Sequence, residues 1–130
     1  MTPITLNLSL LKETYAVCRL NPTTVVGDWA DHGEFCSITK TSEECSVVCP
    51  QDKVPDDIKA EKHWRIFKIE GPFAFTQVGI LNAVTKVLAE NGISLFALST
   101  FDTDYILVKS KDLVHAIECL SQAGHTLTIR

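Results

Sequence analysis

The sequence predicts an α+β protein made of two tandem units, each with strands and helices in the order βαββαβ. Two observations lead to this prediction. The second half of the chain shows strand-like and helix-like hydrophobic patterns in that order. The first half repeats part of the pattern about 60 residues earlier, which indicates an internal repeat. A chain of 130 residues can form one compact domain or two small units that share a core.

The first strand and helix of the second half have clear boundaries. Residues 63–69 are aromatic and β-branched, and they predict a strand. Thr76 is a suitable N-cap for a helix with apolar residues at helical spacing, and Gly92 is suited to end it. On this prediction Gly79 lies inside the helix, at a cost of about 1 kcal/mol relative to alanine.

The remaining elements complete the order. Residues 93–99 are apolar on both faces, as is typical of a central strand. A polar turn over 100–104 leads to a strand over 105–108, so the two strands form a hairpin. A second helix follows Ser110, and residues 125–129 alternate as a last strand. This is the ferredoxin-like arrangement.

The first half is a partial copy of the second. A shift of 60 places residues 35–54 on 95–114, with Glu44 on Asp104 at the polar turn. Prolines and glycines within 21–34 leave room for a turn or two of helix, so we expect the first helix to be shortened or missing. Residues 50–62 predict a short helix or connector, and apolar alternation from Ile4 predicts an extra N-terminal strand. We therefore place the units at 1–60 and 61–130.

Composition excludes several classes of function. The net charge is -4 and the twelve basic residues are scattered, which argues against nucleic acid as a partner. No apolar run approaches the roughly 20 residues that span a bilayer, and the N-terminus lacks the pattern of a signal peptide. The five cysteines include no C-x-x-C pair and are expected to act as small apolar residues. We expect a cytoplasmic protein with no membrane contact.

No catalytic arrangement is evident. The four histidines have spacings that match no metal site or catalytic triad, and we expect His115 and His125 at the surface or rim. The sequence contains no glycine-rich phosphate loop. We therefore expect a protein that is not an enzyme and that uses no metal or cofactor.

Two segments are suited to a small zwitterion. Residues 99–104 place polar groups and one aromatic ring between two apolar strands. The start of the long helix contains Gly79, which admits either a neighbouring chain segment or a ligand. Free N–H groups at a helix N-terminus favour a carboxylate, and Asp104 can hold a cationic group. From spacing alone, a ligand site and a purely structural role both remain open.

Residues 92–108 contain the hairpin motif S-T-F-x-x-D at Ser99–Asp104. Here the chain resembles the ACT-domain family of amino-acid-binding regulatory domains, and most closely the branch with the tandem-ACT cytosolic arginine sensors and short bacterial two-ACT proteins. The resemblance implies that backbone groups near 79–81 bind an α-carboxylate and that Thr100 with Asp104 binds a positively charged end. The implied ligand-binding residues are Ala74, Gln77, Gly79, Ile80, Leu81, Thr100, Phe101, Thr103 and Asp104.

Two functions follow as expectations. The first is a non-catalytic regulatory module that binds an amino acid or similar small zwitterion and works as a homodimer, because the arginine sensors carry four ACT units where this chain carries two. The alternative is a structural or protein-interaction dimerisation domain with a vestigial ligand site.

Overall fold

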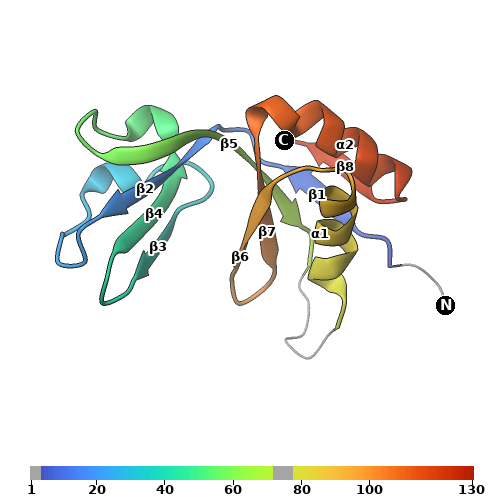
Figure 1. Cartoon of the computed structure of the whole chain (residues 1–130), viewed down its shortest axis with the longest axis horizontal. Helices are drawn as coiled ribbons and strands as arrows, with labels where there is room; N and C mark the ends of the chain where they lie inside the picture. Colours follow the sequence, from blue (N-terminus) through green and yellow to red (C-terminus); the bar gives the residue numbers. More distant parts are fainter. Residues whose placement is uncertain (1–3, 72–77) are drawn as a thin grey trace. The chain divides into compact units, whose positions relative to one another are not determined.

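The computed structural model describes residues 4–71 and 78–130, which form two compact units (Figure 1). Residues 13–64 make up the N-terminal unit. The C-terminal unit consists of the described parts of 1–12 and 65–130. The strands are β1 (Asn7–Leu10), β2 (Tyr15–Leu20), β3 (Ser37–Lys40), β4 (Cys45–Pro50), β5 (Lys59–Ile69), β6 (Leu95–Ser99), β7 (Asp104–Lys109) and β8 (Thr126–Ile129). The α-helices are α1 (Ile80–Glu90) and α2 (Leu113–Gln122), and the 3-10 helices are η1 (Asp28–Ala30), η2 (Gln51–Lys53) and η3 (Ser110–Asp112).

The C-terminal unit follows the predicted order with one insertion. Its elements run β5, α1, β6, β7, α2, β8, and its strands pair in the order β6-β7-β5-β1-β8. Strand β1 lies between β5 and β8: Leu8 is opposite Ile69 in an antiparallel pair and opposite Leu127 in a parallel pair. The predicted boundary left residues 1–12 in the other unit. The structure groups them here because the backbone hydrogen bonds of β1 go to β5 and β8.

The core of the C-terminal unit joins the sheet to both α-helices. Val84 and Leu88 on α1, four residues apart, and Leu120 on α2 are fully buried, so each helix turns one apolar face inward. Phe67 on β5 and Ile106 on β7 are also fully buried in this cluster. Neither α-helix in the described part of the chain has the length and apolar character needed to cross a bilayer.

Two expectations for this unit are wrong. Among the described residues, strand β6 pairs only with β7 and lies at the sheet edge, not in the centre. Its apolar residues 95–98 are all half-buried, so apolar character on both faces does not require a neighbour on both sides. His125 is 5% exposed and is not a rim residue. Its Nδ1 accepts the N–H of Leu6 at 3.1 Å, and its Nε2 donates to the carbonyl of Ala83 in α1 at 3.0 Å.

The N-terminal unit keeps the sheet of this fold but neither α-helix. Its strands pair antiparallel in the order β3-β4-β2-β5, with residues 59–64 of β5 as the last strand. The prediction of a shortened first helix is confirmed, because η1 has three residues. The second helix is also reduced, to η2, because Pro50 and Pro55 lie close to its two ends and β5 begins at Lys59. Three buried cysteines lie in the core of this unit, at positions 18, 45 and 49.

The internal repeat is visible in the two hairpin turns. Thr41 N–H donates to the carbonyl of Glu44 at 2.9 Å, and Thr100 N–H donates to that of Thr103 at 2.8 Å. In each turn the threonine hydroxyl donates to the same carbonyl. Strands β4 and β7, and helices η2 and η3, are offset by 59 positions. The predicted shift of 60 is therefore one residue too long.

Candidate functional site

The start of α1 is set by Gly79. Its φ of +86° lies in the left-handed region, which a glycine adopts without strain. Residues in the interior of a right-handed α-helix do not have this conformation. The helix therefore begins at Ile80, and the expected position of Gly79 inside it is wrong; Thr76, the predicted N-cap, lies outside the described residues. The carbonyl of Gly79 accepts the N–H of Ala83 at 3.0 Å, and no described side chain caps the first turn. N–H groups of the first turn thus lack an intrahelical partner.

The predicted residues on this helix contribute their backbone rather than their side chains. Ile80 is 7% exposed and belongs to the core, and Leu81 packs against the same core. The two other predicted residues of this segment, Ala74 and Gln77, lie outside the described residues. What the described helix start offers a ligand is therefore a set of N–H donors with the partial positive charge of a helix N-terminus.

The second predicted segment is the turn between β6 and β7. Asp104 is half-buried and accepts a hydrogen bond from the hydroxyl of Ser99, its cross-strand partner. Thr103 is 7% exposed, and its hydroxyl donates to the carbonyl of Ile69 at the end of β5. Thr103 therefore ties the hairpin to the strand that leads toward α1. Phe101 at the tip of the turn is 80% exposed.

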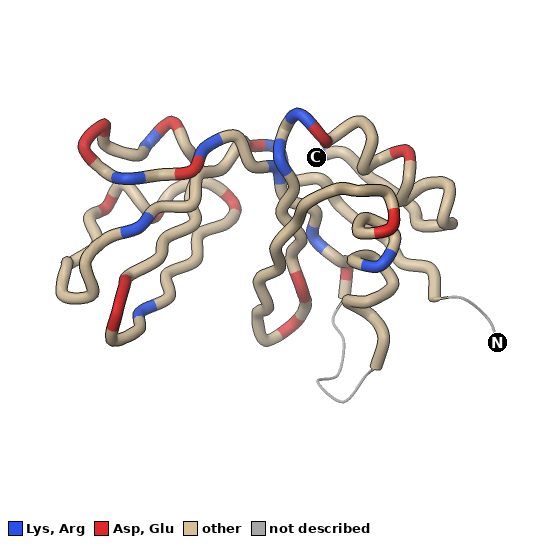
Figure 2. Tube along the Cα trace, viewed as in Figure 1, with Lys and Arg blue, Asp and Glu red and all other residues tan. Residues whose placement is uncertain are grey.

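The charged residues of the turn between β6 and β7, Asp102 and Asp104, are both acidic (Figure 2). A hollow of about 180 Å³ beside the turn is lined by Lys68, Gly71, Asp102 and Thr103. The ammonium of Lys68 lies 3.4 Å from the carboxylate of Glu70, which also pairs with Arg130 at 3.2 Å. Glu70 therefore balances one of these two positive charges, and Asp102 and Asp104, which form no ion pair with the described residues, can receive a cationic group.

Several interactions hold Glu70 in its ionised form. Burial by itself would raise the pKa of this carboxyl group. The hydrogen bond from the hydroxyl of Ser9, at 2.9 Å, and the attraction of Lys68 and Arg130 outweigh burial and hold the pKa below its ordinary value.

The structure places the described predicted residues in two short segments, 79–81 and 100–104. Figure 1 shows the start of α1 and the β6–β7 turn at the same end of the C-terminal unit. Sequence reasoning did not assign a role to Lys68, because nothing in the pattern of β5 distinguishes a residue beside the turn from any other partly exposed residue. It also did not foresee that the Thr103 hydroxyl is used inside the fold.

Comparisons with known proteins match both units. A family model described as an ACT domain matches residues 59–122, and one described as an N-terminal domain matches residues 13–57. A mouse (Mus musculus) protein described as cytosolic arginine sensor for mTORC1 subunit 1 is 29% identical over 99 residues. That match covers 68% of this chain and 30% of the sensor, so the chain spans less than a third of the length of this relative.

Solved structures show the same fold over nearly the whole chain. An Agobacterium tumefaciens protein is 41% identical with a TM-score of 0.91, and the match covers 98% of this chain and 95% of that one. The aspartate kinase of Clostridium acetobutylicum has a TM-score of 0.68 at 14% identity, covering 95% of this chain and 36% of the kinase. The regulatory subunit of aspartate kinase from Thermus thermophilus has a TM-score of 0.64 at 10% identity, covering 90% and 96%.

Proposed function

Because the chain belongs to the ACT-domain family, we propose that it is a non-catalytic regulatory module that binds an amino acid or a similar small zwitterion. One observation carries the proposal. An α-helix whose first turn is capped by no described side chain and a hairpin turn with a half-buried carboxylate lie at the same end of the C-terminal unit. A helix N-terminus attracts carboxylates and a carboxylate attracts ammonium groups, so the two features are complementary to the two charges of a zwitterion.

In this proposal each predicted segment has one role. The N–H groups of residues 79–81 bind the α-carboxylate of the ligand. Asp104, oriented by the hydroxyl of Ser99, binds a positively charged group. The hydroxyl of Thr100 donates to the carbonyl of Thr103, so Thr100 contributes its oxygen as an acceptor. Phe101 covers the ligand with its exposed ring. Thr103 positions the turn through Ile69 and does not need to contact the ligand.

The proposal includes a cytoplasmic homodimer. The mouse relative is described as cytosolic, and it is more than three times as long as the segment that this chain matches. Strand β6 gives a physical reason for self-association. It is a sheet edge that carries no charged residue or proline along 95–99, and natural proteins use such residues to protect free edges.

A thermal-shift screen of the twenty amino acids tests the proposal. A ligand at 100 times its dissociation constant stabilises the folded state by about 2.7 kcal/mol. We expect at least one amino acid to raise the melting temperature of the wild-type chain, and Asp104→Ala to lose that increase. Glu118→Ala, which removes an exposed carboxylate of α2 in the same unit, is the control and should keep it. No increase at millimolar ligand, or an equal increase in Asp104→Ala, would contradict the proposal.

The alternative is a structural or protein-interaction domain whose ligand site is vestigial. One observation favours it: the hydroxyl of Thr103 and one carboxylate oxygen of Asp104 already have partners within the hairpin region. This alternative predicts an oligomer by light scattering and no amino acid that raises the melting temperature.

A further inference from the structure

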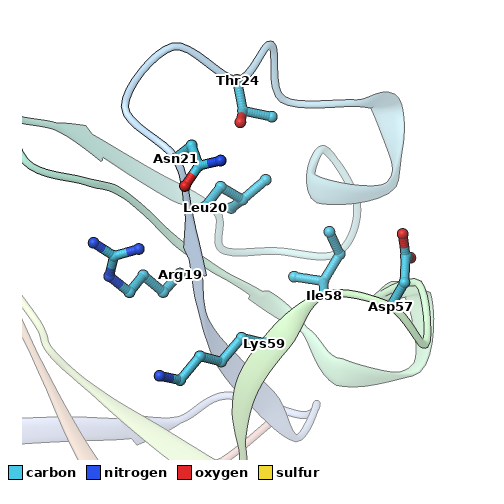
Figure 3. Close-up of a pocket in the computed structure, with 7 residues that line it drawn as sticks. All are labelled: Arg19, Leu20, Asn21, Thr24, Asp57, Ile58 and Lys59. Atoms are coloured by element: carbon cyan, nitrogen blue, oxygen red, sulfur yellow. The ribbon is translucent and has the colours of Figure 1, made fainter.

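The open face of the N-terminal sheet carries a like-charge pair that the fold does not explain. Arg19 on β2 and Lys59 on β5 are directly opposite each other in the antiparallel register. Side chains at opposite positions point to the same face, and like charges there are destabilising. Figure 3 shows both cationic side chains leaving their strands toward the same side. The fold therefore holds two positive charges together at this position.

No carboxylate of the described residues forms an ion pair with either cation. The recorded bond of the Arg19 guanidinium is to the main-chain carbonyl of Glu43, at 3.1 Å, which carries no net charge. A guanidinium has five N–H donors, so most of them remain available to a further acceptor. The ammonium of Lys59 makes no hydrogen bond to the described residues. Neither cation is therefore held in an ion pair within the described part of the unit, although carboxylates lie among the residues around them.

Space for a ligand adjoins the pair on two sides. One hollow of about 300 Å³ is lined by Arg19, Lys59, Leu20, Asn21, Thr24, Asp57 and Ile58 (Figure 3). A second of about 240 Å³ is lined by the same two cations, by Ser46, which is opposite Arg19 on β4, and by two carboxylates, Glu44 and Glu61. An anion is therefore expected in the first hollow, where two cations face a single carboxylate. Figure 3 shows Arg19 and Lys59 extending to one side of their strands, with Leu20, Ile58 and Asp57 toward the other side.

We propose that Arg19 and Lys59 form a binding site for a small oxyanion, a carboxylate or phosphate group on a short carbon skeleton. Guanidinium and ammonium groups are the side chains that proteins use for both anions. The site is suited to a small ligand and not to a polyanion, because the lining of the first hollow holds only two cations and also one carboxylate, Asp57. Leu20 and Ile58 offer an apolar wall for the carbon skeleton, and Asn21 with Thr24 offers further hydrogen bonds.

This site is separate from the amino-acid site proposed above. All of its residues belong to the N-terminal unit, whereas segments 79–81 and 100–104 belong to the C-terminal unit. The module would thus respond to two kinds of small molecule, one through each unit.

Titration of the full chain with sodium phosphate and, separately, sodium succinate at constant ionic strength tests the proposal, with backbone amide shifts followed by NMR. We expect at least one of the two anions to cause saturable shifts centred on residues 19–24 and 57–61. Arg19→Gln or Lys59→Gln should weaken the affinity at least fivefold, and the double variant should abolish saturation. Lys40→Gln, which removes an exposed cation from β3 of the same unit, should leave the affinity unchanged.

The two anions distinguish the possible sources of the oxyanion. Preference for succinate identifies organic acids, and preference for phosphate identifies phosphate esters. The proposal is overturned if neither anion gives saturable shifts, if the double variant binds as the wild type does, or if Lys40→Gln weakens binding as much as Arg19→Gln. The amide spectrum of each variant without anion shows whether it is folded, so a loss of binding is not confused with a loss of structure.

Discussion

Replacing His125 with leucine removes the side chain that links β1, the start of β8 and the first turns of α1. Only a backbone N–H faces Nδ1, so Nδ1 must be the acceptor and the ring proton lies on Nε2, which donates to Ala83. Leucine has a similar volume but no polar atom. The substitution therefore leaves the N–H of Leu6 and the second lone pair of the Ala83 carbonyl without these bonds. Leu6 is itself only 7% exposed, so water cannot easily replace the lost partner of its N–H.

The size of the effect follows from these two bonds. A buried donor left without a partner costs about 1–3 kcal/mol, and the carbonyl costs less because it can keep its helical hydrogen bond. We expect His125→Leu to lower the free energy of unfolding by about 2–3 kcal/mol. For a chain of this length that corresponds to a fall of roughly 6–15 °C in melting temperature. Urea unfolding followed by circular dichroism measures the change, with an unchanged slope against urea concentration.

Two further variants make this test specific. His115→Leu removes an exposed histidine of α2 and should change the free energy of unfolding by less than about 0.5 kcal/mol. His125→Asn can place an oxygen where Nδ1 accepts the bond from Leu6, and it should lose about half as much stability as the leucine variant. The reasoning is refuted if His125→Leu loses no more than His115→Leu, because the two bonds would then contribute nothing to folding.

Two other substitutions test the start of α1 and the segment directly after β5. Gly79→Ala should lose about 1–2 kcal/mol of stability, because φ is +86° and the new Cβ would lie 3.3 Å from Cδ1 of Ile4; urea unfolding showing no loss would contradict this conformation. Glu70→Gln should cost about 0.5–1 kcal/mol at neutral pH. Since the folded-state pKa of Glu70 is lowered, its contribution is present above the unfolded-state pKa and is lost as pH falls through the folded-state value. The difference between wild type and variant in acid unfolding should therefore close at low pH, and a difference that persists there would contradict the role assigned to Ser9, Lys68 and Arg130.

The order of elements in the second half could be predicted from the sequence because each boundary has a local cause. Asn91 and Gly92 end α1, and the continuous run of aromatic, branched and apolar residues over 105–108 in β7 marks a strand without reference to the rest of the fold. The reduced first helix was predictable for the same reason, since the prolines and glycines within 21–34 act on their own segment.

What the sequence did not show depends on pairing between distant segments. The alternation in β1 predicts a strand but not its partners, and only the fold places β1 between β5 and β8. The apolar pattern of β6 is the same for an edge and a central strand. The buried state of His125 depends on Leu6 and Ala83, which lie 119 and 42 positions away, and no local pattern records such a contact.

The candidate site shows the same division. The turn over 100–104 could be identified because turns have characteristic residues. Gly79 was recognised as a place where a ligand could approach, but its position at the start of α1 was not predicted. The use of the Thr103 hydroxyl to bind Ile69 could not, because a threonine in a turn offers the same hydroxyl whether a ligand or the fold takes it. The pairing of Arg19 with Lys59 required the register of β2 with β5.

The position of a bound amino acid is the most direct test of the proposed function. Backbone amide shifts of the full chain would be followed during titration with whichever amino acid raises the melting temperature most. The largest shifts should fall on residues 79–81 and 100–104, and Asp104→Asn, which removes the charge but keeps the shape of the side chain, should lower the affinity at least tenfold. Shifts centred elsewhere in the chain, or an unchanged affinity in Asp104→Asn, would contradict a zwitterion site between the start of α1 and the β6–β7 turn.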